Sequence, residues 1–321
     1  MTWTDRPVHC QSPAMSLAEK PSRAAARTSL RTAAFVLVLA AAAGCAPQED
    51  ADSAKASGAS GTASGAQASC TKGHLATRTA GRLTVGTDKP AYAPPGSRTT
   101  PPPANGKGFE SAVAYAVADR LGYPAGDVVW QTVPFNSAVT PGEKKFDFDI
   151  NQVSVSDERR RAVDFSSGYY DVRQAVIALK DSPAAKARTA ADLKKARLGA
   201  QVGTTSLDVV NDVIKPEKPA AVFQKNDFAK TALKNGQVDA IVVDLPTAFY
   251  ITSTEVPEAK VVGQFEAAAG GRAEQFGLVL DKGSRITGCV SAAVDGLRKD
   301  GTLARLEKKW LSEAVDAPVL K

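Results

Sequence analysis

The chain has 321 residues, of which 43% are hydrophobic and 23% are charged, so it can bury a sizeable core in one large or two ordinary domains. This composition is typical of a soluble globular protein and excludes a disordered or fibrous chain. The formal net charge is +6, and part of this excess lies in the first 44 residues. Because no stripe of Lys and Arg interleaved with aromatic residues is present, we expect no nucleic-acid partner.

The N-terminal segment has the pattern of an exported lipoprotein. Its basic residues end at Arg31, and an apolar run then leads to Ala42-Ala43-Gly44-Cys45. This run is too short for a permanent transmembrane helix and fits the apolar part of an export signal. We therefore predict a lipoprotein signal peptide over residues 1–44 and a lipid on Cys45. An ordinary secretory signal with an incidental cysteine is the alternative, because Ala42 stands where the bacterial lipobox usually has leucine.

The segment after the signal is rich in Ala, Ser and Gly and shows no apolar periodicity, so we expect a flexible tether over residues 45–80. The protein would then be held on the extracytoplasmic face of the cell membrane. In that oxidising compartment the remaining cysteines of the body, Cys70 and Cys289, are expected to form a disulfide. No Cys-x-x-Cys motif and no Cys/His cluster is present, so we expect neither a metal site nor a cofactor.

The body alternates predicted strands and helices. Turn residues and apolar runs predict strands at 83–88, 128–133, 146–150, 198–201, 238–243, 261–263 and 276–280. Periodicity and capping residues predict helices near 109–121, after Thr189, from Gly203 to before Pro216, from Asp227 to Asn235-Gly236, and at 284–298 and 302–312. This alternation indicates an α/β fold with open, largely parallel sheets, which collect ligands at the carboxyl ends of their strands.

Several short motifs occur together in a fixed order. They are Val85-Gly-Thr-Asp88, Gly108-Phe109, Asp119-Arg-Leu-Gly122, Ser154-Val-Ser-Asp-Glu-Arg159, Val163-Asp-Phe-Ser166, Tyr169-Tyr170, Gly203-Thr-Thr205, Gly236-Gln-Val-Asp-Ala240, Asp244, Gly301-Thr302 and Lys309-Trp310. In order and spacing this set resembles family 3 of the bacterial extracytoplasmic solute-binding proteins. The resemblance implies a two-lobed periplasmic-binding-protein-like (type II) fold with a ligand cleft between lobes. It places residues 81–172 and 275–321 in lobe 1 and residues 177–270 in lobe 2.

The resemblance also implies a site for an α-amino acid. Arg159 would bind the ligand's carboxylate, which suits a planar guanidinium that stays charged when desolvated. The Thr205 backbone N–H would bind the same carboxylate from the other lobe, with Thr204 of the same turn also in the site, and Asp244 would accept the ammonium group. The alternatives are a surface arginine within the run Arg159-Arg160-Arg161 and simple helix caps at Thr205 and Asp244.

Further positions are implied to complete the site and select the side chain. Ser154 and the Gln152 backbone would complete the ammonium site, Tyr92 and Phe135 would cover the ligand, and Asp88 and Gln201 would line the cleft. Ordinary core packing is the alternative for Phe135. With two polar groups in the cleft and no evident lysine or second arginine, we expect a polar neutral or cationic ligand rather than an acidic one.

The function implied is that of a monomeric binding protein that delivers an amino acid-like ligand to the permease of an ABC importer. Two alternatives remain: a dehydratase acting on a prephenate-like acid on the same fold, and a ligand-sensing lipoprotein. An enzyme is not expected, because both histidines, His9 and His74, lie outside the predicted cleft and no Ser/His/Asp or Cys/His set is available.

Overall fold

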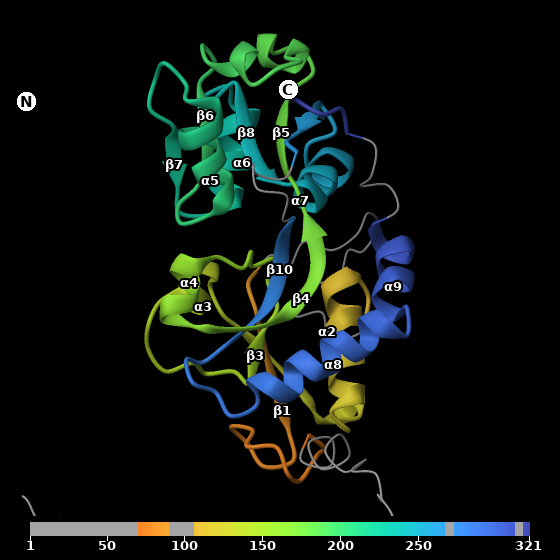
Figure 1. Ribbon diagram of the computed structural model, residues 1–321. Coiled ribbons are helices and arrows are strands. Elements are labelled where there is room, and N and C mark those ends of the chain that lie inside the picture. The colour runs from red at the N-terminus through yellow and green to blue at the C-terminus, as the bar shows by residue number, and fades with distance from the viewer. Residues whose placement is uncertain (1–69, 90–105, 267–272, 312–316) are drawn as a thin grey trace, which may run out of the picture. The chain divides into compact units, whose positions relative to one another are not determined.

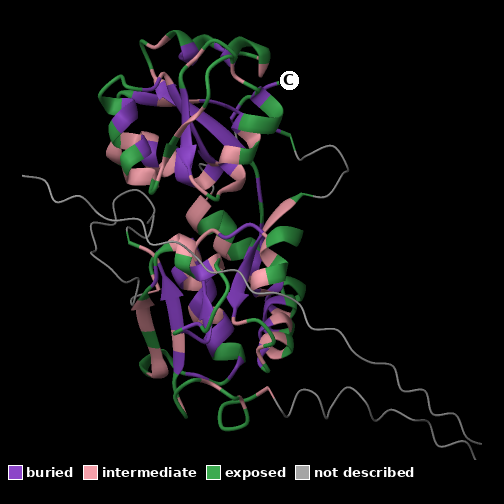
Figure 2. Ribbon diagram, turned by 90° about the vertical axis from the view of Figure 1, so that its left-hand side faces the viewer, coloured by how far each residue is buried: buried purple, intermediate pink, exposed green. Residues whose placement is uncertain are grey.

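The computed structural model describes residues 70–89, 106–266, 273–311 and 317–321 and contains two five-stranded sheets flanked by helices (Figure 1). We call each sheet, with the helices that pack on it, a lobe. The strands of both sheets are largely buried, and exposed residues lie mainly on helices and loops (Figure 2). The predicted signal peptide, Cys45 and Tyr92 lie outside the described residues. Within the described residues, no helix has the length and apolar character needed to cross a membrane.

The first lobe is built on the strand order β2-β1-β3-β10-β4. Its strands are β1 (Leu83–Thr87), β2 (Val128–Thr132), β3 (Phe148–Asp149), β4 (Asp164–Val172) and β10 (Glu274–Leu280). Its helices are α2 (Phe109–Arg120), the 3-10 turn η1 (Ala125–Asp127), α3 (Phe135–Val139), α4 (Asp157–Ala162), α8 (Thr287–Lys299) and α9 (Thr302–Leu311).

Helix α2 shows why the sequence pattern produces this lobe. Phe109, Val113 and Val117 recur on one helical face, and all three are buried in the core beneath the sheet. Gly108 precedes the helix with a φ of 101°, a conformation that a residue with a side chain rarely adopts. The helix therefore begins directly after Gly108 and packs along the first lobe's sheet.

The second lobe has the strand order β7-β6-β8-β5-β9. Its strands are β5 (Gln174–Leu179), β6 (Leu198–Gln201), β7 (Ala221–Phe223), β8 (Ala240–Asp244) and β9 (Ala259–Gln264). Its helices are α5 (Thr205–Asp208), α6 (Asn226–Lys234) and α7 (Leu245–Tyr250), with short 3-10 turns η2 (Pro183–Lys186) and η3 (Ala191–Leu193) and π-helical turns η4 (Val209–Ile214) and η5 (Ile251–Glu255).

The sheets are mixed rather than largely parallel. In each lobe four strands run in one direction, while the strand arriving from the other lobe is antiparallel to both of its neighbours: β10 lies between β3 and β4, and β5 lies between β8 and β9. The chain passes between the lobes where β4 ends at Val172 and β5 begins at Gln174 (Figure 1). The antiparallel strands follow from this crossover, because a strand that enters from the opposite lobe runs in the opposite direction.

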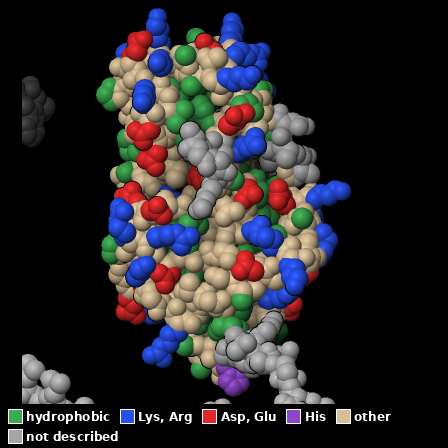
Figure 3. All heavy atoms as spheres, in the orientation of Figure 1, with side chains coloured by type: hydrophobic (Ala, Val, Ile, Leu, Met, Phe, Trp, Pro, Cys, Tyr) green, Lys and Arg blue, Asp and Glu red, His purple; other side chains and the backbone are tan. Residues whose placement is uncertain are grey.

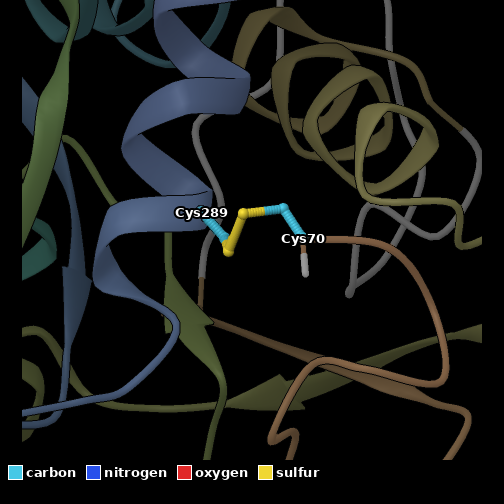
Figure 4. Close-up of a disulfide and its surroundings, with 2 residues drawn as sticks. All are labelled: Cys70 and Cys289. Atoms are coloured by element: carbon cyan, nitrogen blue, oxygen red, sulfur yellow. A yellow bond between two sulfur atoms is a disulfide. The ribbon is translucent and has the colours of Figure 1, made fainter. Parts of the chain in front are cut away.

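Residues 70–80, expected to be the end of a flexible tether, are folded onto the first lobe. Leu75 packs against the core, Lys72 pairs with Asp127, and the backbone N–H of Arg78 donates to Asp147. The disulfide between Cys70 and Cys289 joins this segment to helix α8 (Figure 4), as the sequence predicted. The tether prediction is therefore wrong for these residues.

The C-terminal residues 317–321, expected in lobe 1, pack on the second lobe instead. Val319 forms a parallel bridge with Gln264 of β9, the N–H of Leu320 donates to the carbonyl of Gln264, and the N–H of Ala190 donates to the carbonyl of Lys321. The Leu320 side chain is buried in the second lobe's core. Helix α9 remains packed on the first lobe, so the lobe assignment of 275–321 fails only for this last segment.

Candidate functional site

A cleft with an empty volume of about 630 Å³, counted out to its open mouth, lies between residues of the two lobes. We call it the interlobe cleft. It is lined by Asp88, Lys89, Phe135, Asn151, Gln152, Ser154 and Arg159 of the first lobe and by Gln201, Thr204, Thr205, Ser206, Lys225, Asn226, Asp227, Asp244 and Thr247 of the second. Every ligand-binding residue predicted from the sequence that the structure describes is in this set. The structure therefore brings those residues together, although they come from segments far apart in the chain.

Arg159 lies at the centre of the cleft because of how helix α4 begins. The Ser156 side chain caps that helix by accepting from the Arg159 backbone N–H. The guanidinium donates to the Ser154 carbonyl at 2.6 Å and, across the cleft, to the Gly203 carbonyl at 2.9 Å. It also lies over the Phe135 ring, 5.4 Å from the ring centre, a cation–π arrangement that fixes its orientation.

The electrostatic surroundings keep the Arg159 guanidinium charged. Burial lowers its pKa, and the nearby carboxylates of Asp244 and Glu274 act in the opposite direction. An arginine has five N–H donors, and the two carbonyl contacts leave donors for a ligand carboxylate. Its neighbours Arg160 and Arg161 are exposed, so only one residue of this basic run faces the cleft.

The turn before α5 supplies the opposite wall. Gly203 has a φ of +70°, which favours glycine, and its carbonyl accepts the cross-cleft bond from Arg159. The Thr204 hydroxyl donates to the Gln201 carbonyl at 2.7 Å and accepts from the Leu207 N–H at 3.2 Å, so Thr204 caps α5. The next hydroxyl, of Thr205, donates to Glu274 at 2.6 Å. The helix-cap alternative for Thr205 is therefore wrong, because Thr204 is the capping residue and Thr205 points its hydroxyl at a carboxylate.

Asp244 ends strand β8 and precedes helix α7 without capping it by its side chain. Its Oδ1 accepts from the Gln174 side-chain amide at 2.7 Å. Burial, followed by the negative charge of Glu274, raises the pKa of Asp244 to about 8. The simple helix-cap alternative for this residue is therefore not what the geometry shows.

Gln152 joins the two walls of the cleft. Its backbone is left-handed, with a φ of 49°, which is uncommon for a residue with a side chain. Its N–H donates to Glu110 at 2.7 Å, and its side-chain oxygen accepts from the Thr247 hydroxyl of the second lobe at 2.6 Å. Glu110 also accepts from the Tyr169 hydroxyl. Burial raises the pKa of Glu110 to about 7.

Asp88 and Gln201, which were also predicted, form hydrogen bonds with other residues of the cleft wall. Asp88 accepts from the backbone N–H of Phe135 at 3.0 Å, which positions the aromatic ring beside Arg159. Gln201 is buried, and its side-chain oxygen accepts from the Asn226 N–H at 2.8 Å. These contacts give Asp88 and Gln201 a part in shaping the cleft.

Sequence reasoning missed several residues of the cleft. Lys89 and Lys225 line it, so the expectation that no lysine would be present was wrong. Asp227, predicted to cap α6, lies in the first turn, and the capping position is Lys225. Lys225, Asn226 and Asp227 follow strand β7 after Gln224, and the carboxyl ends of parallel strands line such clefts. No strand was predicted at Ala221–Phe223, so this signal was missed.

The charges of the cleft are mixed in sign. Its lining contains Lys89, Arg159 and Lys225 against Asp88, Asp227 and Asp244, and neither His nor Cys is among the lining residues. Acidic and basic side chains are also interspersed over the face drawn in Figure 3. Among the described residues no group of three or more His, Cys, Asp or Glu side chains could hold a metal ion. A cleft of this kind can bind a molecule that has both a carboxylate and a cationic group.

Comparisons with known proteins identify the family of this chain. The family model for bacterial extracellular solute-binding proteins, family 3, matches residues 83–313. The chain is 30% identical over 207 residues to a probable histidine-binding protein of Campylobacter jejuni, covering 63% of this chain and 76% of that protein. It is 26% identical over 209 residues to the arginine-binding extracellular protein ArtP of Bacillus subtilis, covering 64% and 78%.

Among solved structures, an ancestral arginine-binding protein bound to arginine is similar, with a TM-score of 0.56 and 29% identity over 72% of this chain and 98% of the other. These relatives are named as binding proteins rather than enzymes. The family match extends over both lobes and includes the residues that line the cleft up to Asp244 and beyond. The chain belongs to the bacterial extracellular solute-binding proteins, family 3.

Proposed function

We propose that this protein is the solute-binding component of an ABC importer and that it captures a polar or cationic amino acid, or a related zwitterion, in the interlobe cleft. Arg159 binds the ligand's carboxylate and Asp244 its ammonium group. One observation carries the proposal: a half-buried cation of the first lobe and a half-buried carboxylate of the second line the same cleft. A molecule with both charges can bridge the lobes and so favour their closed arrangement.

The relatives support this ligand class. Those compared above are named for histidine and arginine, and a further solved structure is an ancestral arginine-binding protein bound to glutamine, with 28% identity and a TM-score of 0.59. Cationic and polar neutral amino acids are therefore the first ligands to test. Lys89 and Lys225 add positive charge to the cleft, so acidic amino acids belong in the same screen.

The test is a thermal-shift screen of the twenty standard amino acids followed by calorimetry. A ligand that binds only the folded state raises the melting temperature. For the ligand found, Arg159→Ala should weaken binding by at least about 100-fold, because a charge-assisted bidentate contact is lost. Arg161→Ala should change it by less than about twofold, since an exposed side chain away from the cleft contributes little. Equal affinities of the two variants would refute the role of Arg159.

We also propose that Cys45 carries a lipid that holds the protein on the extracytoplasmic face of the membrane. The apolar run and the small residues before Cys45 support this. In the native host, or in a Gram-positive host, the Cys45→Ala variant should be released into the medium, while the Cys70→Ala variant, which keeps Cys45, should stay with the membrane fraction. Retention of the Cys45→Ala variant on membranes would show that another element anchors the protein.

A further inference from the structure

Glu274 lies at the start of β10, where the chain returns to the first lobe. Its carboxylate contacts Thr205, which lines the cleft, and Gln174. It accepts from the Thr205 hydroxyl at 2.6 Å. It also faces the side-chain nitrogen of Gln174, at 3.2 and 3.3 Å from its two oxygens. Glu274 is not among the residues that line the cleft. Any part it plays in binding therefore acts through other residues.

Gln174 lies on the other crossover, as the first residue of β5, and is only 3% exposed. Its side-chain nitrogen donates to Asp244 at 2.7 Å and lies 3.2 Å from the Thr205 hydroxyl oxygen. Its side-chain oxygen accepts from the Ser206 hydroxyl at 2.6 Å. A single primary amide has two N–H donors, yet this nitrogen faces two carboxylates and a hydroxyl. The carboxylates of Asp244 and Glu274 are thus both within 3.3 Å of one amide nitrogen.

Two carboxylates held this closely repel each other when both are ionised, and such a pair retains a proton that an isolated carboxylate would lose. The charged and titratable groups that face the pair from the surrounding elements are Arg159 of α4, Glu110 of α2, Asp208 of α5, and Tyr169 and Tyr170 of β4. In this set Arg159 alone is a cation. The set therefore leaves the pair with an excess of negative charge.

Building on the proposed function, we propose that Glu274 is a positioning residue of the ammonium site and that Asp244, held beside the negative charge of Glu274, gives up a proton when a ligand's ammonium group binds. The proton passes to solvent, and the ammonium takes its place as the positive charge beside Asp244. The raised pKa of Asp244, which results from burial and then from the charge of Glu274, is consistent with this exchange. Gln174 and Thr205 transmit the effect, because both contact Glu274.

The sign of the pH dependence follows from competition between the proton and the ligand. Below about pH 8 the pair is protonated before binding, so affinity should fall as the pH is lowered, by up to about tenfold per pH unit. Glu274→Gln keeps an oxygen that accepts from Thr205 but removes the charge. Asp244 should then ionise at lower pH, although its burial remains, so the affinity of this variant should fall less steeply between pH 8 and pH 6 than that of the wild-type protein.

The experiment is calorimetry with L-arginine as the probe, at pH 6, 7 and 8, in two buffers of different ionisation enthalpy so that released protons are counted. The wild-type protein should release a substantial fraction of one proton at pH 7, and Glu274→Gln should release much less. Glu266→Gln is the matched control, since it removes the same charge from an exposed residue shortly before the same crossover; it should behave as wild type.

The outcomes separate the two proposals. Binding of L-arginine with no proton release and a flat pH profile in the wild-type protein overturns the inference and leaves the proposed function standing. Wild-type behaviour of Glu274→Gln also overturns it. If neither L-arginine nor any other standard amino acid binds, the proposed function fails and the inference fails with it. If Glu274→Gln does not fold, the absence of proton release from the wild-type protein still overturns the inference.

Discussion

Glu110 contacts the cleft only through Gln152, and it explains how that residue keeps an unusual backbone conformation. A left-handed backbone costs a residue with a side chain on the order of 1 kcal/mol or more. The bond from the Gln152 N–H to Glu110 and the bond from Thr247 to the Gln152 side chain offset this cost. The cleft wall at Gln152 is thus held in place by a carboxylate that does not line it.

Glu110 should also make the stability of the protein depend on pH. Because its pKa is raised from 4.5 to about 7 in the folded protein, the folded state binds a proton more tightly than the unfolded state. This contribution to stability is present below about pH 4.5 and is lost as the pH rises through about 7, at a cost on the order of 3 kcal/mol. Glu110→Gln, which stays neutral, should therefore become more stable relative to wild type between pH 5 and pH 8. Urea unfolding at several pH values measures this difference.

Glu143→Gln is the control for Glu110→Gln. The Glu143 side chain is 79% exposed and pairs with Arg78 at the surface, and exposed ion pairs contribute little to stability. Its curve should run parallel to that of wild type across the whole pH range. A parallel curve for Glu110→Gln as well would mean that Glu110 does not titrate in this range.

The residues that line the cleft could be predicted from the sequence more readily than those that support them. Arg159 and Asp244 follow local patterns, a capped helix start and the end of an apolar strand, and a family resemblance places them together. Glu110, Gln174 and Glu274 follow no such local pattern. Their roles depend on tertiary contacts between residues that are 31 to 100 positions apart in the sequence. Neither periodicity nor capping patterns reveal such contacts.

At the scale of elements, periodic segments were predicted well and segments governed by tertiary contacts were not. The apolar face of α2 and the terminal helices α8 and α9 agree with the structure to within a few residues. Strand β3 covers only Phe148–Asp149, although an apolar run predicted 146–150. The antiparallel placement of β5 and β10 could not be inferred from strand positions, because it depends on which lobe each strand enters.

The start of α6 shows the same limit. Asp227 was expected to cap this helix, since Asp is a favoured capping residue. Lys225 holds that position instead, and the N–H of Asn226 is satisfied by the Gln201 side chain of the neighbouring strand β6. A tertiary contact thus replaces the local cap and draws the helix start into the cleft.

On the scale of the whole molecule, the C-terminal segment links the lobes in addition to the two crossovers. Helix α9 ends at Leu311 against the first lobe's core, while residues 317–321 pair with β9 of the second. The Gln264 side chain donates to the Ala317 carbonyl at 2.7 Å, and the Gln264 N–H donates to the Pro318 carbonyl at 2.7 Å. The chain therefore passes between the lobes three times.

Gly263 is the residue that makes this docking possible. A Cβ at this position would lie 2.7 Å from both the Leu320 side chain and the Pro318 carbonyl oxygen, closer than real Cβ contacts. Gly263→Ala should therefore either detach the segment or strain the sheet, with a loss on the order of 1–3 kcal/mol of unfolding free energy. Thermal and urea unfolding measure this loss.

Two further variants identify the cause of the stability loss expected for Gly263→Ala. Gly288 of α8 has open space around its Cα and lacks a positive φ, so Gly288→Ala should be neutral or stabilising by up to about 1 kcal/mol. In a chain that lacks residues 317–321, Gly263→Ala should cost almost nothing, because the atoms that the new methyl group would meet are gone. If Gly263→Ala lowers the unfolding free energy equally with and without residues 317–321, the strain arises within β9. The C-terminal residues would then not be the reason for a glycine at position 263.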